Sequence, residues 1–232
     1  MRSARPRWKL AALGAALLAL LPLPAGAAAQ PSASELLALV RASESQQNRN
    51  LSGRLRTSSS RGKVVVPFAM LMRPGSITYQ FTNPAEQLTL SMGAKGSKLT
   101  RSGGKGSVRL DEMVRGTDIT YEDLALRFLY WNNAKVIKTD TAMTRKCWVV
   151  QAHPNARGES QYDTVLLWIE KTGGLLRAEC FAEGQLLRRF EVRSVQQARD
   201  SGGGYVLKSM RIQSIDASGR DRSPTYLDIN RT

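Results

Sequence analysis

Few side chains in this 232-residue sequence could carry out chemistry, and they are widely spaced. The single histidine, His153, precedes Pro154 and Asn155 in a segment that we predict to be the end of a strand. Cys147 and Cys180 are the only cysteines, and with one histidine they do not form the ligand set of a zinc site. We therefore expect no metal site and no cofactor.

Neighbouring carboxylates are the next candidates for acid–base chemistry. Asp111 and Glu112 lie in a predicted loop with no histidine beside them, so a proton-transfer partner is lacking. Glu122 and Asp123 are explained better by the start of a helix, as described next. The glycine-rich stretch 103–106 lacks the Ser or Thr that completes a phosphate loop. We therefore predict that the protein is not an enzyme.

A helix is predicted after Thr120. Thr120 and Asp123 have the spacing of a capping box, in which hydroxyl and carboxylate satisfy backbone N–H groups at the start of a helix. An apolar stripe at helical spacing follows over residues 121–131 and includes Tyr121, Leu124 and Phe128. Ser32 and Glu35 form a second capping box before a helix that we expect to end near Gln46.

Elsewhere the hydrophobic pattern has the period of two that is typical of β-strands. The predicted strands cover residues 51–59, 63–73, 76–82, 87–92, 98–101 and 107–110, and then 146–152, 164–170, 175–181, 186–193, 205–215 and 224–229. Eleven or twelve antiparallel strands with one helical insertion predict a mainly β fold with short helices. We expect a single curved antiparallel sheet, or incomplete β-barrel, covered by a helical lid.

One face of the first strands is continuously apolar. By alternation, this face comprises Val64, Val66, Phe68, Met70, Met72, Ile77, Tyr79, Phe81, Leu88, Leu90 and Met92. An ordinary core covered by the two helices is one interpretation. Two short helices leave much of so broad a face uncovered, however, and methionine side chains adapt well to ligands. We therefore favour a hydrophobic ligand cavity lined by these residues.

The N-terminus has the pattern of a cleavable signal peptide. Four basic residues precede an apolar stretch from Leu10 to Leu23, and Ala27–Ala29 offers a small-residue cleavage site. A membrane anchor is the alternative, but the stretch is shorter than the roughly 20 residues needed to span a bilayer. We therefore divide the chain into a signal peptide, residues 1–29, and a single exported domain, residues 30–232.

The charge of the chain bears on its partners. The net charge is +15, and removal of residues 1–29, with four basic and no acidic residues, leaves +11. Export and the lack of a nucleic-acid motif argue against nucleic acid as a partner. Anionic lipid head groups or acidic envelope proteins suit a basic surface better, and charge that only solubilises the surface is the alternative.

A disulfide between Cys147 and Cys180 is possible, because an oxidising compartment permits one. If strand 164–170 lies between the strands that carry them, their backbones are about two strand spacings apart and beyond disulfide reach. Strong sheet curvature or another strand order would bring them closer. The sequence leaves both outcomes open.

The run Gly116–Leu124, GTDITYEDL, resembles a motif of the LolA-like outer-membrane lipoprotein-sorting proteins. Three further segments are similar to that family: Met72–Gly75 with the strand and Asn83-Pro84 after it, the strand 165–172, and the hairpin 184–187. This resemblance implies an incomplete barrel with a helical lid. It also implies a periplasmic carrier whose cavity receives the acyl chains of lipoproteins or related lipids for transfer towards the outer membrane.

The resemblance further implies partners and a latch. The expected partners are an inner-membrane export or transporter component and an outer-membrane acceptor, and the chain is expected to be a monomer. Arg73, before Pro74, matches an arginine implicated in hydrogen-bonding the lid backbone, although a solvated surface arginine is the alternative. Lid and latch would comprise Arg73, Thr120, Tyr121, Leu124 and Phe128. The competing function is a non-transporting periplasmic module of the same fold that senses lipid or binds a protein.

Overall fold

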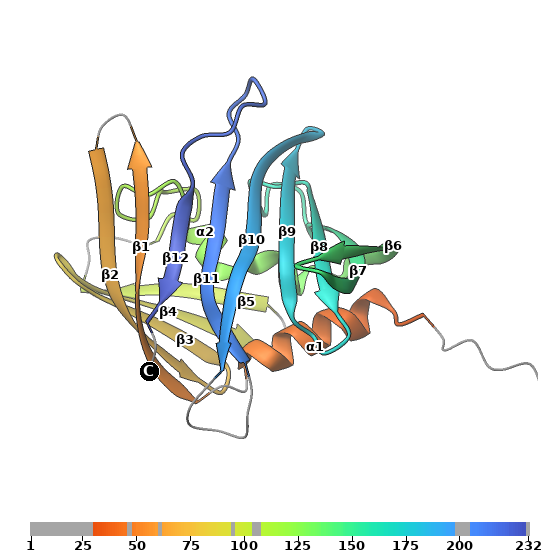
Figure 1. Cartoon of the computed structure of the whole chain (residues 1–232), viewed down its shortest axis with the longest axis horizontal. Coiled ribbons are helices and arrows are strands. Elements are labelled where there is room, and N and C mark those ends of the chain that lie inside the picture. Colours follow the sequence, from red (N-terminus) through yellow and green to blue (C-terminus); the bar gives the residue numbers. More distant parts are fainter. Residues whose placement is uncertain are drawn as a thin grey trace, which may run out of the picture. The chain divides into compact units, whose positions relative to one another are not determined.

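The alternating apolar segments form one antiparallel sheet, which has twelve strands among the residues that can be described (Figure 1). The computed structural model describes residues 30–45, 48–59, 62–93, 96–103, 108–197 and 205–230, and the compact unit that contains the sheet begins at Pro31. Its strands are β1 (Arg49–Ser59), β2 (Gly62–Arg73), β3 (Ser76–Thr82), β4 (Ala85–Gly93), β5 (Gly96–Ser102), β6 (Asn133–Ala142), β7 (Arg145–His153), β8 (Thr164–Glu170), β9 (Leu175–Ala182), β10 (Gln185–Gln197), β11 (Tyr205–Ser214) and β12 (Thr225–Ile229).

The strand order is β5-β4-β3-β2-β1-β12-β11-β10-β9-β8-β7-β6, so β5 and β6 are the two edges. The prediction of a single curved, unclosed antiparallel sheet is confirmed. The predicted strand 107–110 is wrong, because residues 108–110 form a loop and a turn. β6 was not predicted, since most of its side chains are exposed and the apolar alternation is weak.

Two positions in this sheet require glycine, one in a tight turn and one where two strands approach closely. Pro74-Gly75 joins β2 to β3 in two residues, and the positive φ of Gly75, 75°, is one that residues with a side chain rarely adopt. Gly53 lies in β1, where β12 approaches so closely that a Cβ atom would collide with the carbonyl oxygen of Asp228. Side chains at either position would force the backbone to move.

The helices begin at the predicted capping boxes. α1 (Ala33–Ser45) follows Ser32, whose backbone N–H donates to Glu35 Oε2 over 2.7 Å. α2 (Tyr121–Ala125) follows Thr120, whose backbone N–H donates to Asp123 Oδ2 over 2.8 Å. The predicted helix over residues 121–131 is interrupted at Leu126, which has a left-handed φ of 46°. A 3-10 helix, η1 (Arg127–Tyr130), continues from there.

The helices lie between the two edges of the open sheet. α2 and η1 contact β5, η1 contacts α1, and α1 contacts β6. Figure 1 shows α1 crossing near the ends of β8 and β9. Leu36, Leu37 and Val40 of α1 are buried in the core. No helix that the structure describes is long and apolar enough to cross a membrane.

Both cysteines are buried free thiols, so the possible Cys147–Cys180 disulfide is not formed. Cys147 lies on β7 and Cys180 on β9, with β8 between them. Cys147 packs with Val149 and Trp168 on the outer side of the sheet, whereas Cys180 belongs to the main core. The two thiols therefore occupy opposite faces of the sheet, which excludes a bridge.

Candidate functional site

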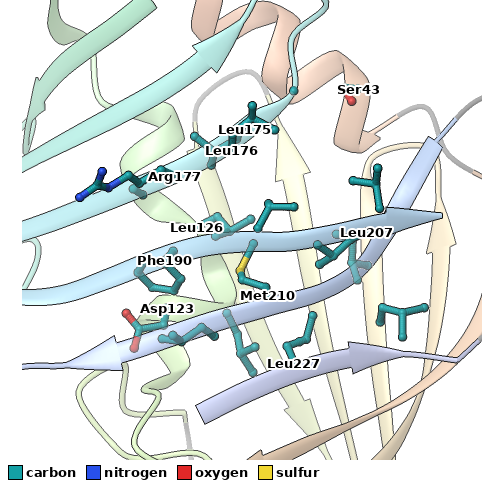
Figure 2. Close-up of a pocket in the computed structure, with 18 of the residues that line it drawn as sticks. Ser43, Asp123, Leu126, Leu175, Leu176, Arg177, Phe190, Leu207, Met210 and Leu227 are labelled. Carbon is teal, nitrogen blue, oxygen red and sulfur yellow. The ribbon is translucent and has the colours of Figure 1, made fainter. Parts of the chain in front are cut away.

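A cavity of about 650 Å³ lies between the sheet and residues 119–130, which we call the lid (Figure 2). This volume is within the roughly 300–1,000 Å³ of sites that enclose one small ligand. The apolar side chains of the sheet that line it are Leu51, Met70, Met72, Ile77, Tyr79, Leu175, Leu176, Ala178, Phe190, Val192, Val195, Leu207, Met210, Ile212, Leu227 and Ile229. The charged side chains that line it are fewer: Asp123 of α2, and Arg145, Glu170 and Arg177 of the sheet. The cavity is therefore suited to an apolar ligand.

The predicted cavity residues divide into two groups. Met70, Met72, Ile77 and Tyr79 line the cavity. The others belong to the packed core or lie against it: Val64, Val66, Phe68, Phe81, Leu88, Leu90 and Met92. In that region the ring of Phe68 packs edge to face against Tyr79 and Phe81, with centroids 5.8 and 6.3 Å away. This half of the sheet is thus filled by its own aromatic side chains.

The other half of the sheet supplies most of the lining, and sequence reasoning missed it. Phe190 and Val192 alternate along β10, and Leu227 and Ile229 alternate along β12. The same period of two that identified the first strands is present here and would have found these residues. The lining is therefore supplied mainly by β9–β12, with four residues from β2 and β3 and one from β1.

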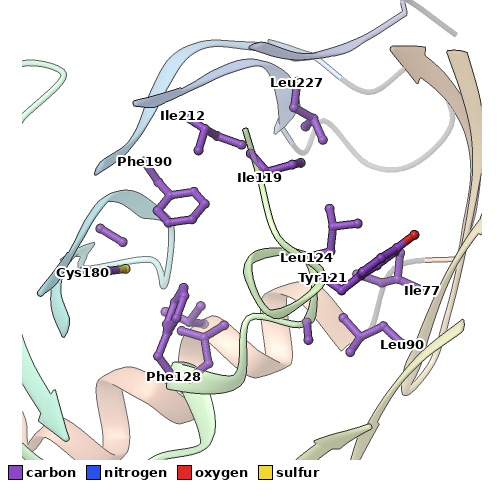
Figure 3. Close-up of a cluster of buried hydrophobic side chains, with 14 of the residues drawn as sticks. Ile77, Leu90, Ile119, Tyr121, Leu124, Phe128, Cys180, Phe190, Ile212 and Leu227 are labelled. Carbon is purple, nitrogen blue, oxygen red and sulfur yellow. The ribbon is translucent and has the colours of Figure 1, made fainter. Parts of the chain in front are cut away.

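The lid closes the cavity with apolar side chains. Leu124 and Phe128, both predicted as lid residues, line it together with Ile119 and Leu126. Figure 3 shows Phe128 facing Phe190 of β10, and the ring centroids are 6.3 Å apart. Thr120 caps α2 instead of facing the cavity. The hydroxyl oxygen of Tyr121 accepts a hydrogen bond from Arg101 Nη2 of β5 over 2.8 Å.

A buried ion pair fastens the lid to the sheet. Arg188 Nε of β10 lies 3.4 Å from Asp123 Oδ2, and the side chains are only 7% and 1% exposed. Asp123 also accepts a hydrogen bond from the hydroxyl of Tyr162 over 2.6 Å. Arg188 Nη1 donates to the carbonyl oxygen of Asp118 and, over 2.7 Å, to Ser214 Oγ of β11. This network joins the lid to two strands and to the loop before β8.

Arg73, which was predicted to bind the lid backbone, instead hydrogen-bonds to residues of β1 and β2. It donates to the carbonyl oxygens of Arg49 and Met72 over 3.3 and 2.8 Å, and to Asn50 Oδ1 over 2.9 Å. These bonds tie the end of β2 to the start of β1. Other arginines bind backbone carbonyl groups in or beside the lid. Arg41 Nη1 of α1 donates to Leu129 O over 2.6 Å, and Arg188 Nη1 donates to the carbonyl oxygen of Asp118, one residue before the lid.

Polar residues surround the mouth of the cavity. Ser43 of α1, Arg145 of β7, and Glu170 and Thr172 at the end of β8 all line it. Arg145 Nη1 donates to Glu170 Oε2 over 2.9 Å, and Thr172 Oγ1 donates to Glu170 Oε1 over 2.6 Å. Burial raises the pKa of Glu170, but these two hydrogen bonds outweigh it, so the pKa lies below its ordinary value. Glu170 is therefore the charged acceptor that holds this side of the mouth together.

We expect the protein to lose stability in alkali. Burial, followed by the negative charge of Asp123, raises the pKa of Tyr162 and of Cys180 well above their ordinary values. In the unfolded chain these groups ionise near pH 8.5 (Cys) and pH 10 (Tyr), whereas the folded protein keeps both protons. The free energy of unfolding should therefore fall above about pH 9, by up to about 1.4 kcal/mol per pH unit for each group.

Urea denaturation at neutral and alkaline pH measures this loss. Tyr162→Phe should make the decline above about pH 10 less steep, since one titrating group is removed. The variant also loses the hydrogen bond to Asp123, which lowers its free energy of unfolding at every pH. The quantity to compare is therefore the slope of the free energy of unfolding against pH. A parent protein whose free energy of unfolding did not change between neutral and strongly alkaline pH would contradict the expectation.

No metal-binding cluster accompanies the cavity in the part of the chain that the structure describes. Groups of three or more His, Cys, Asp or Glu that could hold a metal ion do not occur there. His153 is the last residue of β7, and its Nδ1 lies 2.9 Å from the carbonyl oxygen of Asp163. The cavity can enclose an apolar molecule, and the charged side chains that line it, Asp123, Arg145, Glu170 and Arg177, are all in ion pairs.

Comparisons with known proteins agree with this geometry. A family model described as an uncharacterized protein matches residues 105–230. No curated protein matches the chain. A putative outer membrane lipoprotein-sorting protein domain from Vibrio parahaemolyticus is similar in structure, with a TM-score of 0.65 and 14% identity over 85% of this chain and 92% of that one.

Two further solved structures have the same fold. A LolA superfamily protein from Nitrosomonas europaea has a TM-score of 0.64 and 14% identity over 87% of this chain and 93% of that one. A DUF1329 family protein from Desulfovibrio piger has a TM-score of 0.63 and 14% identity over 85% of this chain and 90% of that one. The fold of the described unit is thus that of the LolA superfamily.

Proposed function

We propose that this chain, which belongs to the uncharacterized protein family whose model matches residues 105–230, is a periplasmic carrier that binds acyl chains of lipoproteins or related lipids. The observation that supports this proposal most strongly is the apolar cavity of about 650 Å³ beneath the lid. Transfer of an acyl chain from water into such a cavity gains about 0.8 kcal/mol per buried CH₂ group. The proposal is for binding and carriage without catalysis.

Export is part of the proposal. Residues 1–29 would act as a cleavable signal peptide and release a chain that begins near Gln30. An inner-membrane export or transporter component would then load the carrier, and an acceptor at the outer membrane would receive the cargo. These partners are inferred from the fold that the chain has in common with the lipoprotein-sorting domain from Vibrio parahaemolyticus.

Cargo would enter at the mouth rather than by release of the lid. The lid is tied to the sheet by the buried Asp123–Arg188 pair, and separation of such a pair is costly because it leaves two buried charges without partners. The mouth is different. Ser43 and Arg145 line it and are exposed, so an acyl chain can reach the cavity beside them without breaking that pair.

The decisive test is mass spectrometry of the protein isolated from a bacterial envelope under non-denaturing conditions. We expect a chain that begins near Gln30 and carries bound lipid, which is then passed to acceptor vesicles. The Leu227→Trp variant, prepared in the same way, should carry much less lipid because Leu227 lines the cavity. Isolation of a protein partner with an empty cavity and no lipid transfer would instead favour a non-transporting interaction module.

A further inference from the structure

The turn between β6 and β7 has an unfavourable sequence for its shape. Met143 and Thr144 are its two central residues and have φ angles of 48° and 62°. Positive φ at both positions is the mark of a type I′ turn, which favours Asn, Asp and Gly. Met and Thr carry a conformational penalty there, so local turn stability does not explain the choice of residues. Met143 lines the cavity and is nevertheless 38% exposed.

Two more apolar side chains are exposed around the same opening. Val195, near the end of β10, also lines the cavity and is 36% exposed. Leu39 of α1 is 45% exposed, and its backbone lies against Gly173 in the β8–β9 turn, beside the mouth residues Thr172 and Gly174. We call Leu39, Met143 and Val195 the rim. The rim surrounds the mouth with apolar groups that contact water.

Basic residues lie beside the rim. Arg145 and Lys146 directly follow the β6–β7 turn, and both are exposed. Lys171 is exposed one residue beyond Glu170, which pairs with Cys147, so the register places Lys171 next to Lys146. The negative charge of Glu170 is already paired with Arg145. The described side chains on this side of the mouth therefore leave an excess of positive charge.

We propose that the mouth docks on the surface of an anionic lipid bilayer. The rim would enter the head-group region, and Lys146 and Lys171 would contact anionic head groups, the combination by which interfacial proteins bind membranes. The net charge of +15 has the sign that such a surface attracts. Docking in this orientation lets an acyl chain pass between bilayer and cavity without crossing water. The inference rests on the proposed carrier function and adds the surface on which it operates.

The test uses the chain without its first 29 residues and sedimentation with vesicles. Vesicles of phosphatidylcholine mixed with phosphatidylglycerol should bind the protein, vesicles of phosphatidylcholine alone should bind it much less, and added salt should release it. Lys146→Gln with Lys171→Gln should lower the partition coefficient about fivefold per lysine. The matched control is Lys63→Gln with Lys135→Gln, two exposed lysines towards the starts of β2 and β6, away from the strand ends at the mouth, and it should change binding little.

A rim variant separates docking from folding. Met143→Asn with Thr144→Gly supplies the residues that the type I′ turn favours, so its melting temperature should rise while its binding to vesicles falls. Equal binding by the parent and both mouth variants, or no binding to the anionic vesicles, would overturn the proposal. Uptake of a fluorescent fatty acid in the absence of vesicles is measured in parallel. If the parent takes up the fatty acid but does not bind the anionic vesicles, the docking surface alone is refuted. If the parent binds the vesicles but takes up no fatty acid, the carrier function is refuted.

Discussion

Leu227→Trp should weaken the uptake of an acyl chain by roughly 50-fold and leave the protein folded. Leu227 lies on β12 and lines the cavity, so a larger side chain can extend into the cavity instead of displacing neighbours (Figure 2). If the indole excludes about three methylene groups of the ligand, the loss at about 0.8 kcal/mol each is close to 2.4 kcal/mol. Titration with a fluorescent fatty acid measures the affinity, and thermal unfolding measures the stability.

The same substitution at Leu88 is the matched control. Leu88 is completely buried on β4, and it packs in the core without lining the cavity. Overpacking such a site typically costs about 1–3 kcal/mol of stability, so Leu88→Trp should unfold more readily than Leu227→Trp. If Leu227→Trp bound the fatty acid as tightly as the parent, the apolar ligand would have to bind somewhere other than this cavity.

Asp123→Ala should lower the free energy of unfolding by about 3–5 kcal/mol, as expected when a buried charge loses its partner. The loss of the α2 cap alone accounts for only about 1 kcal/mol of this. The rest arises because Arg188 remains buried beside Tyr162 and Ser214 without its ion-pair partner. Urea denaturation of the variant and the parent measures the difference.

Two further variants test whether the unpaired charge of Arg188 causes this loss of stability. Asp111→Ala removes an acid from an ion pair with Arg109 whose side chains are 63% and 74% exposed, and it should have little effect. Arg188→Met added to Asp123→Ala removes the unpaired charge, so the double variant should recover part of the lost stability. A double variant that was even less stable than Asp123→Ala would show that the unpaired arginine is not the reason.

Much of the fold could be predicted because its signals are local. The capping boxes at Ser32 and Thr120 depend on residues three positions apart, and both helices begin where these boxes place them. The alternation along β2 likewise identified the face that is buried. β6 was not predicted because it is an edge strand with largely exposed side chains, so its sequence lacks the apolar alternation that identifies a strand.

The site was harder to predict because it depends on contacts between distant parts of the chain. Arg188 and Asp118 are 70 residues apart, and Arg41 and Leu129 are 88 apart. No local sequence motif therefore identifies Arg188 and Arg41 as the arginines that bind backbone carbonyl groups in or beside the lid. The position of the cavity depends on which half of the sheet has its concave side occupied by its own side chains. Alternation marks both Phe68 and Phe190 as inward-facing, and both pack against other rings, but only the folded structure shows that Phe190 also lines the cavity while Phe68 does not.

The helices between the edge strands β5 and β6 have a mechanical consequence. In a closed barrel the bore is set by the number of strands and their stagger, because each step around the wall is a hydrogen-bonded ladder of nearly constant width. Here part of the circumference consists of α1, η1 and α2, and α1 meets β6 through side-chain packing. Packing distances vary with the side chains in contact, whereas ladder spacings do not. The width of the enclosed space can thus adjust where α1 meets β6 while every strand keeps its register, and the proposed carrier would accommodate cargoes of different thickness without any change in the sheet.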